Sequence, residues 1–379
     1  MIVVEVKTSK QAQEFLEVPK ILYRSDKNWV CPLDQDIEAI FDAKKNNFHQ
    51  HGEVTRWILK NKSGNLIGRV AAFINHEKAH SFDMPTGGIG FFEVINNYEA
   101  AKTLFDSCKN WLSARGMKAM QGPINFGEND TFWGLLAEGF TRPSYGMNYN
   151  FPFYKEIFEQ YGFICAYEQI SNMIDIAKPF PERFTKIANW VSQKEGYEFK
   201  HFEKKNLERY AKDLLDIYND AWRDFDNFVP MQLETVLTSF HKMKLIVDEK
   251  LIWFAYVDGI PAAFVVIIPD INPLIKNLNG KLNLWEKIRF LYYKHFSGTD
   301  RIRAIVMGTK KKYQKHGLES ALFIQLKSYI LSLNNRYKEL ELSWVGDFND
   351  PMLAIHQATG ATFSKKHITY IKKFDTASN

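Results

Sequence analysis

Cysteine is scarce in this chain, which argues against two common kinds of stabilising framework. Only Cys31, Cys108 and Cys165 occur among 379 residues. An odd number of widely spaced cysteines does not form a disulfide framework, and these three match no Cys-x-x-Cys or Cys/His zinc spacing. We therefore expect reduced thiols, as in a cytoplasmic protein, and no bound metal.

Long apolar segments are missing as well. The longest apolar run, Ile260 to Pro269, is far shorter than the roughly 20 residues that a membrane-spanning helix needs. The first residues, MIVVEVKTSK, lack the basic and then apolar stretches of a secretory signal. We expect a soluble, cytoplasmic protein without a transmembrane segment.

Neither charge sign dominates, and residues typical of disorder are few. The net charge is +5, with basic and acidic residues interleaved, so DNA binding is not indicated. With 21 Gly, 13 Pro and 45% hydrophobic residues, the composition is that of a globular protein. The length favours two domains, each with its own core. No GxSxG or paired Cys/His signature indicates nucleophilic catalysis.

The order of predicted elements repeats along the chain. The first half is predicted to contain a strand at 2–7, a helix at 10–23, a hairpin at 57–75, a strand at 88–94, a helix at 98–115 and a strand at 117–121. The second half is predicted to contain a strand at 197–203, helices at 207–223 and 231–242, a hairpin at 251–268, a strand at 302–307, a helix at 319–333, a strand at 339–345, a helix at 351–359 and a strand at 367–373. Repetition of this order predicts an α/β fold with mixed sheets, present in two copies.

One stretch of the second half, 301–331, carries the clearest chemical signal. A predicted strand leads into a basic turn with one glycine, and the turn opens directly into a helix. Backbone N–H groups and the positive end of the helix dipole then converge on one spot, which suits a pyrophosphate. Further positive charge comes from Lys310, Lys311, Lys312, Lys315 and His316.

This turn resembles the acyl-CoA loop of the GNAT superfamily of N-acyltransferases, Gln/Arg-x-x-Gly-x-Gly/Ala after the fourth strand. Gln314 and Gly317 match the pattern, whereas Glu319 replaces its last small residue. The sequence Asn349-Asp350-Pro351, followed by Ala354, Gly360 and a strand around Tyr370, is similar to the closing pattern of the family. The resemblance implies that acetyl-CoA or another acyl-CoA is a substrate. Its expected contacts are Ala304, Ile305, Val306, Gln314, Lys315, His316, Gly317, Leu318, Glu319 and Ser320.

The resemblance also implies direct attack of an amine on the thioester, between two strands that splay apart. A small-molecule amine or an amino-acid-like compound would be the acceptor. The catalytic candidates are Glu341, Asp347, His356 and Tyr370. His356 lies at or beside the position of the helix tyrosine that often protonates the leaving thiolate. Each candidate also has a structural reading, respectively a solvent-facing strand residue, a helix cap, a surface histidine and a core tyrosine.

The whole chain resembles tandem GNAT-like bacterial proteins with a Gly-Pro-x-Asn segment and a later Gly-Phe-x-x-Pro, here at 122–125 and 139–143. We expect a degenerate first domain at 1–150, a connecting segment at 151–195 and an acyl-CoA-binding domain at 196–379. The first half has no counterpart of the loop, because the residues after its strand at 88–94 have neither the motif nor a lysine cluster.

Several alternatives stay open at this point. The insert at 272–296 is amphipathic, so it is a packed helix, a lid over an apolar acyl group, or a patch that touches a membrane or an acidic carrier protein. The chain as a whole is an N-acyltransferase, a peptidyltransferase-like protein that uses aminoacyl-tRNA, or a non-catalytic protein of the same fold. Salt-sensitive tRNA binding would favour the second reading.

Overall fold

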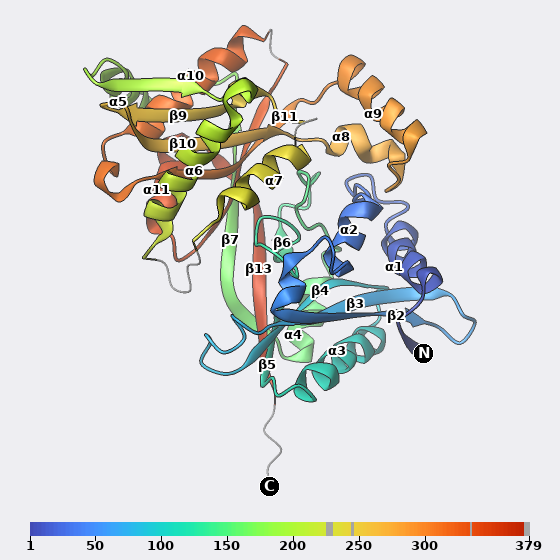
Figure 1. Ribbon diagram of the computed structural model, residues 1–379. Coiled ribbons are helices and arrows are strands. Elements are labelled where there is room, and N and C mark those ends of the chain that lie inside the picture. The colour runs from blue at the N-terminus through green and yellow to red at the C-terminus, as the bar shows by residue number, and fades with distance from the viewer. Residues whose placement is uncertain (225–229, 244–245, 334–335, 375–379) are drawn as a thin grey trace. The chain divides into compact units, whose positions relative to one another are not determined.

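The computed structural model describes residues 1–224, 230–243, 246–333 and 336–374 (Figure 1). The chain divides into two compact units. Unit 1 comprises Met1–Gln169, Leu274–Phe296 and Lys365–Asn379, and unit 2 comprises Ile170–Pro273 and Ser297–Ser364. Each unit is built around a mixed β-sheet with helices, which confirms the predicted α/β class.

In unit 1 the strands follow the order β1-β2-β3-β4-β5-β13, with β6 also paired to β13. Their bounds are β1 (Ile2–Glu5), β2 (Gly52–Lys60), β3 (Leu66–Asn75), β4 (Thr86–Val94), β5 (Ala119–Gly122), β6 (Leu135–Glu138) and β13 (Thr362–Lys373). β1 to β4 are joined by antiparallel ladders, whereas β4 and β5 run parallel. The sheet is therefore mixed, and it includes β13 from the carboxy-terminal end of the chain, which also neighbours β7.

Helices cover both faces of this sheet. Because side chains alternate along a strand, Ile58 of β2 packs with Phe15 of α1 (Ser9–Leu22), whereas Leu59 packs with Leu104 of α3 (Tyr98–Ser113). α2 (Asp34–Phe41) contributes to the first cluster and α4 (Tyr154–Tyr161) to the second. Caps fix where two helices begin: Thr8 forms a capping box for α1, and Asn97 accepts from the N–H of Ala100 in α3.

In unit 2 the strand order is β7-β12-β11-β10-β9-β8. The bounds are β7 (Ile164–Asp175), β8 (Tyr197–His201), β9 (Ile252–Val257), β10 (Ile260–Pro269), β11 (Arg301–Thr309) and β12 (Glu339–Gly346). The ladders from β8 to β11 are antiparallel, and β11 and β12 run parallel. Asp258 and Gly259 join β9 to β10 with φ of 51° and 75°, as the predicted two-residue hairpin requires.

Two helical layers enclose the second sheet. α5 (Glu182–Ser192) and α10 (Leu318–Ser332) pack on the face that carries Ala263 and Val265, whereas α6 (Leu207–Trp222) and α7 (Leu233–Met243) pack on the face of Phe264 and Val266. α11 (Asp350–Ala358) follows β12. The second sheet thus has a core on each side.

The assignment of two parts of the chain to units, the insert and the strands β7 and β13, does not follow from their position in the sequence. The insert forms α8 (Asn272–Ile275) and α9 (Leu284–Phe296), and its residues from Leu274 to Phe296 belong to unit 1. β7 and β13 each have residues in both units. The segment predicted to connect the domains, 151–195, contains α4, β7 and α5. In the described part of the chain, no helix combines the length and apolarity needed to cross a membrane.

Candidate functional site

The parallel strands β11 and β12 of unit 2 separate after a short ladder. Their pairing runs from Arg301 with Glu339 to Ala304 with Leu342. β11 continues to Thr309 and β12 to Gly346 without further pairs between them. Side chains in the separated part are only half-buried, namely Ile305, Val306, Met307, Ser343 and Trp344. β11 and β12 therefore separate as the sequence-based expectation of two splayed strands requires.

A bulge in β11 lies at the point where the strands separate. On the other side of β11, Val306 pairs with Val266 and Ala304 pairs with Ile267, so Ile305 has no partner in that ladder. Ile305 also lies beyond the last pair with β12. Ile305 thus has no Cα partner in either ladder, and it lies within the predicted contact set of Ala304, Ile305 and Val306.

The basic turn has the backbone shape of an anion-binding loop. After the 3-10 turn Lys311–Tyr313, Lys315 and Gly317 both adopt positive φ, 66° and 78°. Gly317 is the N-cap residue of α10, and no side chain caps this helix end. Since first-turn N–H groups have no acceptor within a helix, those of Leu318, Glu319 and Ser320 are suited to bind an anion.

The charges of this turn divide into two groups. Lys310 pairs with Asp216 at 2.5 Å, and the backbone N–H of Lys311 donates to Asp220 at 2.8 Å, so carboxylates of α6 anchor the start of the turn. Lys312 and Lys315 instead have exposed side chains. The turn therefore keeps positive charge at its tip.

Three other predicted loop residues make defined contacts. The carboxylate of Glu319 accepts from the Thr309 hydroxyl at 2.6 Å, which ties it to the end of β11. Gln314 is exposed, and its side-chain amide donates to the Thr309 carbonyl at 3.4 Å. His316 is exposed, and its Nδ1 lies 3.3 Å from the Tyr197 hydroxyl.

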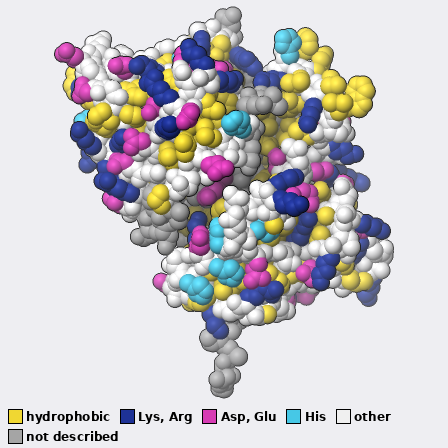
Figure 2. Space-filling view, viewed as in Figure 1, with side chains coloured by type: hydrophobic (Ala, Val, Ile, Leu, Met, Phe, Trp, Pro, Cys, Tyr) yellow, Lys and Arg dark blue, Asp and Glu magenta, His cyan; other side chains and the backbone are white. Residues whose placement is uncertain are grey.

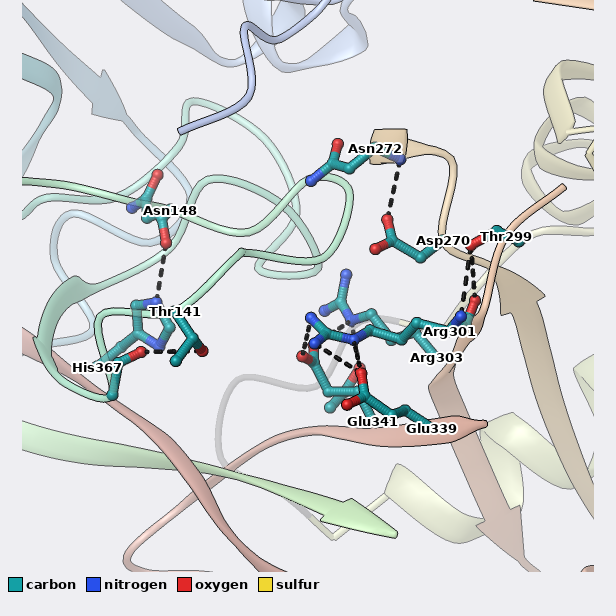
Figure 3. Close-up of polar contacts among 12 residues, drawn as sticks. Thr141, Asn148, Asp270, Asn272, Thr299, Arg301, Arg303, Glu339, Glu341 and His367 are labelled. Atoms are coloured by element: carbon teal, nitrogen blue, oxygen red, sulfur yellow. Dashed lines mark hydrogen bonds and ion pairs between the residues drawn. The ribbon is translucent and has the colours of Figure 1, made fainter. Parts of the chain in front are cut away.

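A buried charged cluster lies where β11 and β12 are still paired, just before the two strands separate (Figure 3). Arg301 contacts Glu339 at 2.8 Å and Glu341 at 3.9 Å, and Arg303 lies 3.7 Å from Glu341 and donates to Ser343 at 2.9 Å. Asp270, at the end of β10, accepts from the backbone N–H of Asn272 at 3.0 Å. Arg301 and Arg303 thus pair with the carboxylates of Glu339 and Glu341, and Asp270 lies on the neighbouring strand end.

The four catalytic candidates lie in different surroundings. Glu341 belongs to the buried cluster and is 1% exposed. Asp347 is exposed just after β12. Tyr370 lies on β13 within the core of unit 1, where its hydroxyl donates to Glu159 at 3.0 Å. Unit 2 therefore holds Glu341, Asp347 and His356, and Tyr370 belongs to unit 1.

His356 is a buried, neutral side chain on α11. Its Nδ1 lies 3.0 Å from the amide nitrogen of Asn172, so Nδ1 accepts this hydrogen bond. Burial lowers the pKa of His356 to about 4. Burial thus favours the uncharged imidazole at neutral pH, and a catalytic role for His356 stays a prediction.

The matching place in unit 1 is filled by the chain itself. β4 and β5 also separate after a short parallel ladder, which ends at Gly88 and Gln121. The Ile124 N–H then donates to the Ile89 carbonyl at 2.7 Å, and a Cβ on Gly90 would meet the Ile124 carbonyl at 2.1 Å. This backbone contact occupies the place between β4 and β5, and the absence of coenzyme binding in the first copy stays a prediction.

Sequence reasoning missed the arginines and Asp270 of the charged cluster. A signal was present, because Arg301 and Arg303 alternate with Ile302 and Ala304 in a strand that otherwise reads as buried. Charges at alternating positions of a buried strand need partners on one face.

Within the described residues, no three His, Cys, Asp or Glu side chains are grouped so as to hold a metal ion.

Comparisons with known proteins place this geometry among known folds. A bacterial ceramide synthase from Caulobacter vibrioides is 28% identical over 98% of this chain and 97% of the relative. Protein YghO from Escherichia coli is 28% identical over 95% and 92%. No protein-family model matches the chain. A solved tandem GNAT protein from the clavulanic acid biosynthesis pathway superposes with a TM-score of 0.59 and 11% identity, covering 100% of this chain and 99% of that one. The chain is therefore a protein of the tandem GNAT fold.

Proposed function

We propose that the protein is an N-acyltransferase that uses a long-chain acyl-CoA and a long-chain amine, with its site in unit 2. The observation that carries this proposal is the separation of β11 from β12 at the bulged Ile305, next to the uncapped N-terminus of α10. The separated strands would hold the thioester, and the N-terminus of α10 would hold the pyrophosphate, so binding of an acyl-CoA needs both features. Unit 1 differs at both places, since its splay is filled and Asn97 caps α3.

The coenzyme part of the substrate binds the turn in this proposal. The N–H groups of Lys315 to Ser320 surround the pyrophosphate, and the exposed ammonium groups of Lys312 and Lys315 pair with phosphate oxygens. The Glu319 carboxylate does not take part in this phosphate contact, because it accepts a hydrogen bond from the Thr309 hydroxyl at 2.6 Å. The pantetheine arm then follows β11 toward Ile305.

The reaction joins an amine to the acyl carbon. The nitrogen attacks the thioester carbonyl, the C–N bond forms, the C–S bond breaks, and coenzyme A leaves as its thiol with the proton that the amine loses. The peptide N–H near Ile305 polarises the carbonyl oxygen. The protonated amine binds beside the carboxylates of the charged cluster, and Glu341 accepts its proton before attack.

The chain-length class of both substrates comes from the sequence relative. A ceramide is the amide of a long-chain amino alcohol with a fatty acid, and a ceramide synthase forms that bond. At 28% identity over nearly the full length of both chains, the ceramide synthase of Caulobacter vibrioides supports the same class of reaction here. The acceptor is accordingly a primary amine on a long-chain amino alcohol.

Coenzyme binding is the first test. Isothermal titration with coenzyme A should show binding that Lys315→Glu weakens at least tenfold, because a phosphate contact becomes a repulsion. Lys62→Glu is the matched control, since Lys62 is an exposed lysine in the β2–β3 turn of unit 1. Equal affinities of the two variants for coenzyme A would remove the phosphate assignment.

Product formation is the second test. Palmitoyl-CoA is incubated with sphinganine or with the matching long-chain diol that lacks nitrogen, and thiol release and the amide mass are both followed. The amine should be acylated and the diol should not. Glu341→Gln should lower kcat by two to three orders of magnitude with little change in coenzyme affinity, as loss of a general base predicts. Acylation of the diol at the same rate would contradict an amine acceptor.

A further inference from the structure

α9 presents an apolar face to solvent. Six of its side chains are between 51% and 75% exposed, namely Leu284, Trp285, Ile288, Leu291, Tyr292 and Phe296. At 100° per residue, these positions fall within about 140° of the helix circumference. Phe290 lies on the opposite side and is buried. α9 is therefore amphipathic, but its apolar face points to solvent, whereas an ordinary surface helix turns that face toward the core.

This orientation is fixed by contacts within unit 1. The Gly280 carbonyl accepts from the Asp34 N–H at 2.8 Å, and the Lys276 ammonium donates to the Lys27 carbonyl at 2.9 Å. Asn283 accepts from the Glu286 N–H at 3.1 Å and so defines the start of the helix. The apolar face is thus held outward by the segment that precedes it.

Basic side chains border the apolar face. Lys287 is exposed on one side of it and Arg289 on the other, and Lys281 is exposed just before the helix. Glu286 supplies the acidic group of α9, and its side chain is only 16% exposed and pairs with Arg289 at 3.0 Å. Figure 2 shows hydrophobic side chains gathered over α9, with Lys and Arg side chains close by.

We infer that α9 binds the surface of a membrane that contains anionic phospholipid and lies in the plane of the headgroups. Its 13 residues span about 20 Å, which is too short to cross a bilayer but suits in-plane insertion. The apolar side chains enter the acyl boundary, Trp285 and Tyr292 sit at the interface, and the flanking cations meet lipid phosphates.

Charge and polarity favour lipid over a protein partner as the occupant. A protein groove would need carboxylates on both sides of an apolar channel to match Lys287 and Arg289, whereas an anionic headgroup layer supplies negative charge on every side. The exposed face itself offers few hydrogen-bonding groups, which suits hydrocarbon. This inference does not depend on the acyltransferase activity.

Vesicle sedimentation with the full chain tests the inference. The parent protein should bind vesicles of phosphatidylcholine mixed with phosphatidylglycerol more tightly than vesicles of phosphatidylcholine alone. Trp285→Ser combined with Ile288→Ser should weaken this binding at least tenfold. Trp190→Ser is the matched control, because Trp190 is 62% exposed on α5 of unit 2, and it should leave binding unchanged.

A charge variant separates the electrostatic contribution. Lys281→Ala with Lys287→Ala should weaken binding to the anionic vesicles about fivefold per lysine and leave binding to phosphatidylcholine nearly unchanged. No binding of the parent protein to either vesicle would overturn the inference. So would equal loss in the Trp190 control, or a dimer of the parent protein that the Trp285/Ile288 variant abolishes without any vesicle binding.

Discussion

Replacing His356 with asparagine should change how the stability of unit 2 depends on pH. Asparagine keeps an oxygen near the position of Nδ1, so the hydrogen bond from Asn172 can persist while the titrating group is lost. Burial lowers the pKa of His356 from 6.5 to about 4. The folded state therefore resists protonation, and the unfolded chain does not.

The sign and size of this pH effect on stability follow from the linkage between proton binding and folding. A depressed pKa contributes stability that is fully present above pH 6.5 and is lost as pH falls toward the folded pKa of about 4, because the unfolded state takes up the proton first. Between pH 7 and pH 5 this loss amounts to about 2 kcal/mol, and it approaches about 3 kcal/mol when the folded state also protonates.

Urea denaturation at several pH values measures this difference. His356→Asn should lose about 2 kcal/mol less than the parent protein between pH 7 and pH 5. His80→Asn removes an exposed histidine of unit 1 and is the control. NMR of labelled histidines gives a direct reading, since the signal absent in His356→Asn should not titrate above pH 5. A His356 signal that titrates near pH 6.5, or parallel stability curves, would refute the reasoning.

Three further predictions concern buried charge and the coenzyme loop. Burial raises the pKa of Glu93 from 4.5 to about 7, so unit 1 should lose up to about 3 kcal/mol as pH rises through this window, and Glu93→Gln should abolish the loss in urea titrations at pH 5 and pH 8. Glu319→Gln removes a negative charge beside the loop and should tighten coenzyme A binding severalfold in low-salt calorimetry, less at high salt. Gly317→Val places a Cβ 2.7 Å from Ile187 at φ 78° and should lower the melting temperature more than Gly64→Val, where φ is 82° and no atom lies within 4 Å.

Local sequence signals predicted the elements whose formation depends on neighbouring residues. The Asp258-Gly259 turn adopts the positive φ values that its composition suggests. The strand expected at 302–307 and the helix expected at 319–333 appear as β11 and α10, with ends shifted by one or two residues. The backbone of the loop between them was also readable, because Gly317 takes the left-handed conformation that favours glycine.

Long-range pairing explains what the sequence did not reveal. β7 (Ile164–Asp175) lies in the segment interpreted as a connection, and its sequence has no sustained apolar alternation. It forms a strand because β12 and β13, from the far end of the chain, provide its ladder partners. The insert also contacts residues distant in sequence, since Gly280 bonds to Asp34. Such pairings leave no local signal.

The candidate site shows the same division between local and distant information. The lysine-rich turn and its glycine were identifiable, and their role in coenzyme binding stays a prediction. The carboxylates that pair with Lys310 and Lys311 come from α6, about 90 residues earlier, so which lysines remain exposed depended on the fold. Asp270 joins Arg301 and Arg303 in the cluster only because β10 and β11 are neighbours.

The two copies of the fold differ at the place where their parallel strands separate. Parallel strands that separate leave peptide groups without partners, and buried peptide groups must be satisfied. In unit 1 the chain meets this need itself, since Ile124 donates to Ile89 and Asn97 satisfies an N–H at the start of α3. In unit 2, Ile305 has no Cα partner in the ladder with β10, and no side chain caps the start of α10. We therefore expect substrate binding between the separated strands of unit 2 and only a structural role for the corresponding place in unit 1.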